Sequence, residues 1–334
     1  MLQQIILPKF NSKLEEQLVK LFHELNLPLH FNKTGNKEFT NYQRVSIIIL
    51  FFKSKKSLRD FVDEINETRW TSWLGLKKEI KKSTLHDWLK LFDLQIIRKI
   101  CKILSPKKIE LTSIDATGID AWQRSRHYEK RSEEIKKLPP MNYAKATLFI
   151  DVKTQIILDF DLVMSKQHDI KIAERIFKRN KIKDVFGLGD KGYDCEYLHE
   201  TARENGITFY APVRKMSKLA LKNKRPSGKH RRECVNMPEF KGMRSINETT
   251  NSVLKRTQIH CLRSKKHFMR EREFGWQVIL YNLKRKIKVS PKDKTQTFIF
   301  WQVQILVFPD RAEIFFSSLL NELSKYFSGL GPIV

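Results

Sequence analysis

The feature that most constrains the fold of this 334-residue chain is a change of hydrophobic spacing near residue 107. Before it, apolar residues recur at steps of three and four, as between Leu14 and Leu25, which is the spacing of a helix that buries one face. Beyond it, apolar residues alternate with less apolar ones, as between Ile156 and Leu162, which is the period of a strand with one buried face. The sequence therefore predicts a helical region followed by one that contains a sheet.

The predicted elements of the second region follow a definite order. Three strands come first, then helix, strand, helix and strand, and long helices from about residue 242 to 287. The predicted strands are 109–116, 144–151, 155–164, 185–189 and 207–213, and the shorter helices are 170–179 and 195–205. Successive strands predict an antiparallel meander, whereas strands alternating with helices predict parallel pairs with helices on both faces. We therefore expect an α/β fold with a mixed five-stranded sheet flanked by helices.

These patterns divide the chain into three predicted parts. Residues 1–105 form a helical domain whose short helices, tight joints and basic outer positions resemble a DNA-binding helix-turn-helix module. A plain helical bundle that braces the rest is the alternative. Residues 106–289 form the domain with the sheet. In residues 290–334 the runs 298–301 and 303–308 are apolar with few charges, and we assign this tail no role.

The net charge limits the classes of molecule that this protein is expected to bind. Lys and Arg number 64 against 37 Asp and Glu, which gives +27 and an isoelectric point near 9.9. An excess of this size is typical of proteins that bind nucleic acid or an anionic membrane surface. The apolar runs are too short to span a bilayer, and the first residues lack the pattern of a signal peptide. We expect a cytoplasmic, nucleoid-associated protein that binds double-stranded DNA and no membrane.

Three acidic residues stand where such a fold would bring them together. Asp115 ends the apolar run of the first predicted strand, Asp190 follows the strand 185–189, and Glu248 lies in a predicted long helix. Neighbouring parallel strands would place the two aspartates side by side, and a helix packed across the sheet would add the glutamate. Carboxylates suit Mg²⁺, a hard ion that prefers oxygen, and paired ions catalyse phosphodiester chemistry. Taken singly, each aspartate is better explained as a helix cap or turn residue, and it is the combination with the order of elements and the charge that favours a metal site.

Two basic residues accompany the glutamate. Arg244 and Lys255 lie four residues before and seven after Glu248, so all three share one stripe of a helix. In that arrangement the two cations flank the carboxylate and contact phosphates on either side of it. An exposed, salt-bridged helix face is the simpler explanation of the same spacing.

Further cations follow the second aspartate. Lys191 is adjacent to Asp190 and could reach a phosphate, although a lysine at a helix start is equally common. Residues 214–232 hold nine basic residues and no acid, Arg231 and Arg232 among them, with Pro-Ser-Gly in the middle. We predict a loop that contacts the substrate; a solvated surface loop is the alternative.

Three other acidic residues are predicted to have structural roles rather than to bind a metal. Asp194 is predicted to cap the helix that starts at about residue 195 rather than to bind a metal. Asp159 and Asp161 share one face of a predicted strand, and a surface edge of the sheet accounts for both.

Three sequence blocks resemble the catalytic blocks of DDE transposases from prokaryotic insertion sequences. They are Ser-Ile-Asp-Ala-Thr-Gly at 113–118, Gly-Asp-Lys-Gly-Tyr-Asp at 189–194, and the set Arg244, Glu248 and Lys255. The resemblance covers roughly residues 40–288 and implies a ribonuclease-H-like sheet of five strands, the first three antiparallel. It implies that the two aspartates and the glutamate hold the metal, and that Arg244 and Lys255 contact DNA near the transposon end. Many relatives carry Tyr three residues before the arginine; Lys241 stands there in this chain, and we expect it to contact DNA.

The resemblance also implies an activity. The N-terminal helices would bind terminal inverted repeats, and the catalytic residues would cleave the element's ends and join the freed 3′-hydroxyl to target DNA. Mg²⁺ would serve as cofactor, with Mn²⁺ able to substitute, and a homodimer would hold two ends in a synaptic complex. The alternatives are an inactive or regulatory DNA-binding relative and a metal-dependent nuclease of the same fold that cleaves without joining.

Overall fold

The structure is a computed structural model that describes residues 13–31, 37–120, 143–164, 167–214, 226–235 and 241–289. The described residues as far as Ile287 belong to one compact unit. No helix in these ranges is long and apolar enough to cross a membrane. The tail 290–334 lies outside the described residues, and the domain boundaries placed at residues 105 and 289 stay predictions.

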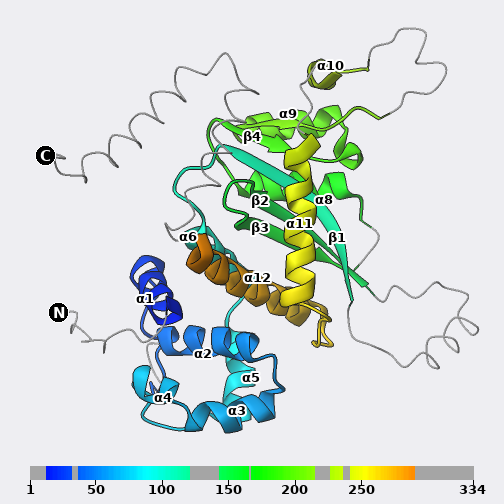
Figure 1. Ribbon diagram of the computed structural model, residues 1–334. Coiled ribbons are helices and arrows are strands. Elements are labelled where there is room, and N and C mark those ends of the chain that lie inside the picture. Colours follow the sequence, from blue (N-terminus) through cyan, green and yellow to red (C-terminus); the bar gives the residue numbers. More distant parts are fainter. Residues whose placement is uncertain are drawn as a thin grey trace, which may run out of the picture. The chain divides into compact units, whose positions relative to one another are not determined.

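The first part of the chain is helical, as its spacing predicts (Figure 1). Local capping explains where two of the helices begin. Thr40 and Gln43 form a capping box at the start of α2, and the Ser57 hydroxyl accepts the amide of Asp60 at the start of α3. The helices are α1 (Lys13–Leu25), α2 (Asn41–Ser54), α3 (Leu58–Glu67), α4 (Arg69–Trp73), α5 (Lys82–Leu91) and α6 (Leu94–Leu104).

The sheet has five strands in the order β3-β2-β1-β4-β5. β1 pairs antiparallel with β2 and β2 with β3, whereas β4 pairs parallel with β1 and β5 with β4. The strands are β1 (Leu111–Asp120), β2 (Tyr143–Asp151), β3 (Ile157–Val163), β4 (Val185–Leu188) and β5 (Ile207–Tyr210). This topology confirms the expected mixed sheet, with an antiparallel first half and parallel additions, as in the ribonuclease-H-like fold.

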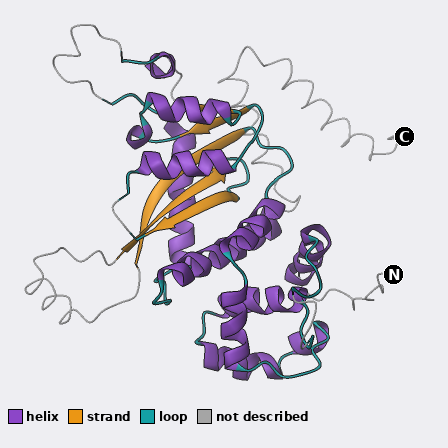
Figure 2. Cartoon of the chain, turned by 180° about the vertical axis from the view of Figure 1, so that it is seen from behind, coloured by secondary structure: helices purple, strands orange, loops and turns teal. Residues whose placement is uncertain are grey.

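Helices cover both faces of the sheet (Figures 1 and 2). α8 (Asp169–Arg179) and α9 (Glu196–Glu204) lie on one face, and α11 (Lys241–Thr257) crosses the other. α12 (His267–Val289) contributes to the same hydrophobic core as α1 to α6, and a short helix α10 (Lys229–Val235) precedes α11. Alternation along β2 explains the two cores: Leu148 and Ile150 join the core with α6 and α12, whereas Phe149 joins the core with α8 and α9.

The outer edge of the sheet at β3 is closed by α6 and α12. Gly275 of α12 lies close to both α6 and β3: a Cβ at this position would be 2.5 Å from Ile97 of α6 and 2.8 Å from Phe160 of β3. The buried amide of Asn282 accepts a hydrogen bond from Ile157 N at 2.9 Å and donates one to Ile157 O at 2.8 Å. Side chains of α12 therefore satisfy backbone groups that an edge strand otherwise leaves open.

The prediction that Asp159 and Asp161 lie on an exposed edge is wrong. Both are buried, with 2 % and 7 % of their surface exposed. Arg179 Nε donates to Asp159 at 3.1 Å and Arg175 Nε to Asp161 at 3.3 Å, while Asn180 Nδ2 donates to Asp159 at 2.6 Å. The end of α8 supplies these donors, and buried carboxylates are tolerated when they are paired and hydrogen-bonded in this way.

We predict that Asn282→Ala destabilises the protein by about 2–4 kcal/mol, because both the N–H and the C=O of Ile157 would be buried without partners. Urea unfolding followed by circular dichroism measures the free energy of unfolding. Lys288→Ala, at an exposed position of the same helix, is the control and should change it by less than about 0.5 kcal/mol. An equally small change for Asn282→Ala would contradict this account of the edge.

Candidate active site

The register of the two central parallel strands sets the first two acids level with each other. Leu111 pairs with Phe186 and Ser113 with Leu188. Continued by two residues, the same register places Asp190 opposite Asp115. β4 ends at Leu188, so Asp190 stands just beyond it and is exposed, whereas Asp115 is half-buried within β1.

α11 brings the third acid to the same strand. Two asparagines of this helix bond to β1: Asn247 Nδ2 donates to Ser113 Oγ at 3.2 Å, and Asn251 Nδ2 donates to Asp115 Oδ2 at 2.9 Å. Glu248 stands between the two in sequence, and its side chain is exposed. These contacts fix the helix turn that carries Glu248 against the strand that carries Asp115.

The charges of Asp190 and Glu248 both affect the pKa of Asp115. The pKa of this carboxyl is raised to about 6, mainly by burial and also by the negative charges of Asp190 and Glu248. Hydrogen bonds from the Ala116 backbone and from Asn251 act in the opposite direction. A raised pKa with two like charges nearby is the expected state of an acid at a site made to receive a cation.

The three carboxylates do not form a compact shell around one point. Within the described ranges, no group of three or more His, Cys, Asp and Glu side chains could hold a single metal ion. The structure instead sets Asp115 within electrostatic reach of Asp190 and of Glu248. Every candidate donor is a carboxylate oxygen, which suits a hard ion such as Mg²⁺.

The turn after Asp190 is held by hydrogen bonds from two directions. Asp190 Oδ1 accepts the amide of Gly192 at 2.7 Å, at the start of a short 3₁₀ turn η1 (Lys191–Tyr193). A Cβ at Gly192 would be 2.8 Å from that oxygen, so glycine permits the close approach. Arg214 Nε donates to Lys191 O at 2.7 Å and its Nη2 to Gly192 O at 2.6 Å. The Lys191 side chain itself is exposed.

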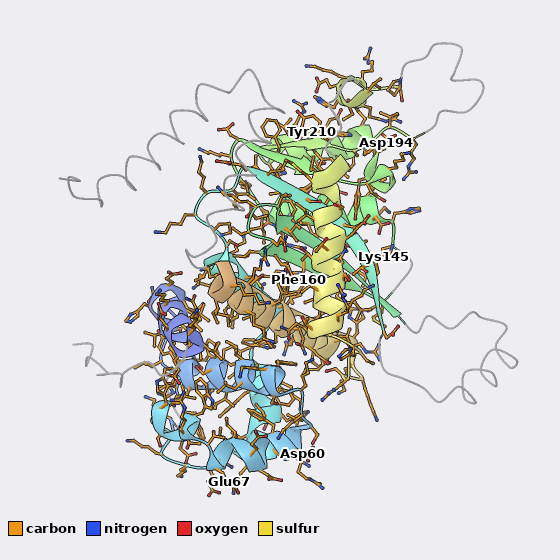
Figure 3. The ribbon with its side chains drawn as sticks, in the orientation of Figure 1. Asp60, Glu67, Lys145, Phe160, Asp194 and Tyr210 are labelled. Atoms are coloured by element: carbon orange, nitrogen blue, oxygen red, sulfur yellow. The ribbon has the colours of Figure 1, made fainter. Side chains whose placement is uncertain are left out.

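The prediction that Asp194 caps the next helix is wrong. α9 begins after Cys195, and no side chain caps it. Asp194 is labelled in Figure 3. Its carboxylate is buried and accepts hydrogen bonds from Arg231 Nε at 2.7 Å, Arg231 Nη2 at 2.8 Å and the Arg214 backbone amide at 2.9 Å. Burial acts to raise the pKa of Asp194, but these donors outweigh it and leave that pKa below its ordinary value. Asp194 therefore joins both ends of the stretch between Arg214 and Arg231.

The remaining predicted DNA contacts are placed unevenly. Lys255 is half-buried on α11, and Arg232 is exposed, with its Nε donating to Gly228 O at 2.9 Å. Lys241 and Arg244 lie in the first turns of α11, but their side chains are outside the described part, as are residues 215–225 of the basic stretch. Arg231 lies in the ion pair with Asp194.

Sequence reasoning missed Asn247, Asn251 and Arg214. The sequence did carry one signal for the asparagines. They are one helical turn apart on either side of Glu248, so they share a face of the predicted helix. Arg214 carried no signal beyond being the first of nine basic residues.

Comparison with known proteins places this site in a family. A family model described as the transposase DDE domain matches residues 106–283, just over half of the chain and including all three acids. No curated protein matches the chain. Among solved structures, one titled "Cryo-EM structure of piggyBac transposase synaptic complex with hairpin DNA" aligns with 11 % identity and a TM-score of 0.40, over 91 % of this chain and 80 % of that one. The family match extends from just before β1 into α12, and the chain belongs to the transposases with a DDE domain.

Proposed function

We propose that this transposase binds the terminal inverted repeats of an insertion sequence, cleaves at the element's ends and joins the 3′-hydroxyl to target DNA. The observation that carries the proposal is the electrostatic convergence on Asp115, whose pKa responds to both Asp190 and Glu248. Asp115 lies on β1, Asp190 lies just beyond the end of the adjacent parallel strand β4, and Glu248 lies on the helix that bonds to β1. This order and this placement are what a phosphodiester-cleaving carboxylate site needs.

The acids fit a Mg²⁺ or Mn²⁺ site in which Asp115 is shared. Mg²⁺ usually takes one or two protein carboxylates and completes its shell with water and substrate phosphate oxygens, so a cluster of three protein ligands is not required. Asp115 with Asp190 would hold one ion and Asp115 with Glu248 the other. When bound, the ions supply activation of the attacking oxygen and stabilisation of the leaving one.

The chain's own cations would orient the DNA. We propose phosphate contacts by Lys191, Arg231, Arg232, Lys241, Arg244 and Lys255, and recognition of the terminal repeats by the helical domain at residues 1–105. Arg231 has a second task, since its guanidinium already pairs with Asp194. The catalytic domain would span residues 106–289. Two ends must be held together for joining, so we propose a homodimer in a synaptic complex on the nucleoid.

We predict that Asp115→Asn, Asp190→Asn and Glu248→Gln each lower Mg²⁺-dependent cleavage of a terminal-repeat duplex by at least ~10²-fold. Asp120→Asn, at an exposed position of the same strand, is the control and should retain activity. The same labelled duplex reports strand transfer. Cleavage without joining would favour a nuclease of the same fold, and unchanged cleavage in Asp115→Asn would remove the proposed site.

The raised pKa of Asp115 predicts a trade between stability and activity. Its folded pKa of about 6 lies above the unfolded value of about 3.9, so the folded state binds more protons between these pH values. Ionisation of Asp115 therefore lowers the free energy of unfolding. This loss is absent below about pH 4 and complete above about pH 6. Asp115→Asn should raise the free energy of unfolding by about 1–3 kcal/mol at pH 8 with EDTA and change it little at pH 4. Urea titrations at both pH values test this, and equal effects at both would contradict it.

We predict that Lys255 contributes one phosphate contact. Lys255→Ala should reduce the slope of log affinity against log salt by about one, measured by fluorescence anisotropy on duplex DNA. Lys178→Ala removes the same charge from α8, on the other face of the sheet, where Lys178 pairs with Glu174. This control should leave the slope at its wild-type value. If Lys255→Ala gives the same slope as Lys178→Ala, Lys255 does not contact DNA.

A further inference from the structure

Two buried asparagines of α11 face alternate residues of β1. Asn247 and Asn251 are one helical turn apart and expose 1 % and 6 % of their surface. Their amide nitrogens donate to Ser113 and to Asp115, which point to the same face of the strand. The Oδ1 atoms of both asparagines are buried without a hydrogen-bond partner in the described part of the molecule. The two residues thus make the same kind of contact with chemically different partners.

The partner of Asn251 is a carboxylate, and the neutrality of the amide matters there. Asp159, Asp161 and Asp194 are buried carboxylates paired with arginines. An arginine neutralises a carboxylate and would compete with any cation for it. An amide donor orients Asp115 without cancelling its charge, and so leaves the carboxylate able to bind a cation.

The unpartnered Oδ1 of Asn251 adds a second observation. A buried amide oxygen without a donor costs roughly 1–3 kcal/mol, and such atoms call for an explanation in a native structure. A water molecule bound to a cation at Asp115 would donate to this oxygen and remove the cost. Oδ1 shares its amide group with Nδ2, which donates to Asp115 Oδ2 at 2.9 Å. Oδ1 therefore lies near the carboxylate where such a water would bind.

We propose that Asn251 is a positioning residue for the cation site. Its Nδ2 orients Asp115, and its Oδ1 receives a water of the bound ion. The proposal rests on the proposed function, because it assumes that Asp115 binds a divalent cation. Asn247, whose partner is the Ser113 hydroxyl, holds the helix without touching the cation site.

The test compares Asn251→Ala with Asn247→Ala in the full chain. Electron paramagnetic resonance of Mn²⁺ measures ion affinity directly, and thermal unfolding in EDTA measures the structural loss. Both variants should lower the melting temperature, since each loses a buried hydrogen bond. Asn251→Ala should weaken Mn²⁺ binding by about 10–100-fold, as loss of a residue that orients a ligand does, whereas Asn247→Ala should weaken it far less. Asn251→Ala should also raise the Mg²⁺ concentration needed for half-maximal cleavage.

The outcomes separate the two proposals. Mn²⁺ affinities that fall equally in both variants, or in neither, would overturn the role of Asn251. Wild-type protein that binds no Mn²⁺, or binds it as well after Asp115→Asn, would overturn the proposed function and the role of Asn251 with it. Asn251→Ser leaves a polar side chain that is too short to reach Asp115, and it serves for the same measurements where the alanine variant does not fold.

Discussion

The pairing of β1 with neighbours on both sides determines the rest of the site. β2 fixes it from one side in antiparallel register and β4 from the other in parallel register. Side chains of a strand alternate between faces, so a slip by one residue would turn Asp115 to the opposite face, away from α11. The antiparallel pairing along the whole strand, from Thr112 with Asp151 to Asp120 with Tyr143, prevents such a slip. The sheet thus fixes where the first acid points before any ligand is present.

The buried acids of this protein are handled in two ways. Asp159 and Asp161 of β3 and Asp194 before α9 are neutralised by arginines and link these elements to others. Asp115 is instead held by an amide and placed near two further acids. The first arrangement stabilises the fold, and the second lowers its stability when no cation is bound. This contrast supports the proposal that Asp115 has a catalytic role.

Much of this could be predicted from the sequence, for physical reasons. Apolar period distinguishes strand from helix locally, so the predicted strand 185–189 lies within one residue of β4. The positions of Asp115 and Asp190 at strands follow from the same local signal. Asp159, Asp161 and Asp194 could not be placed, because their burial depends on arginines from other elements 14 to 37 residues away in sequence. Asn251 pairs with a residue 136 positions away, and no local pattern reports a contact of that range.

The attachment of Arg214 and Arg231 to one carboxylate has a consequence for how the protein can vary. The backbone of Arg214 and the side chain of Arg231 meet on Asp194, while the Arg214 side chain holds the turn that follows Asp190. The interval between them begins and ends at the same point of the fold. Closing a flexible loop at such a point costs only roughly 0.6 kcal/mol more for each doubling of its length. Because Arg214 and Arg231 are both fixed on Asp194, we expect variants that differ in length between them to keep the turn after Asp190 in place.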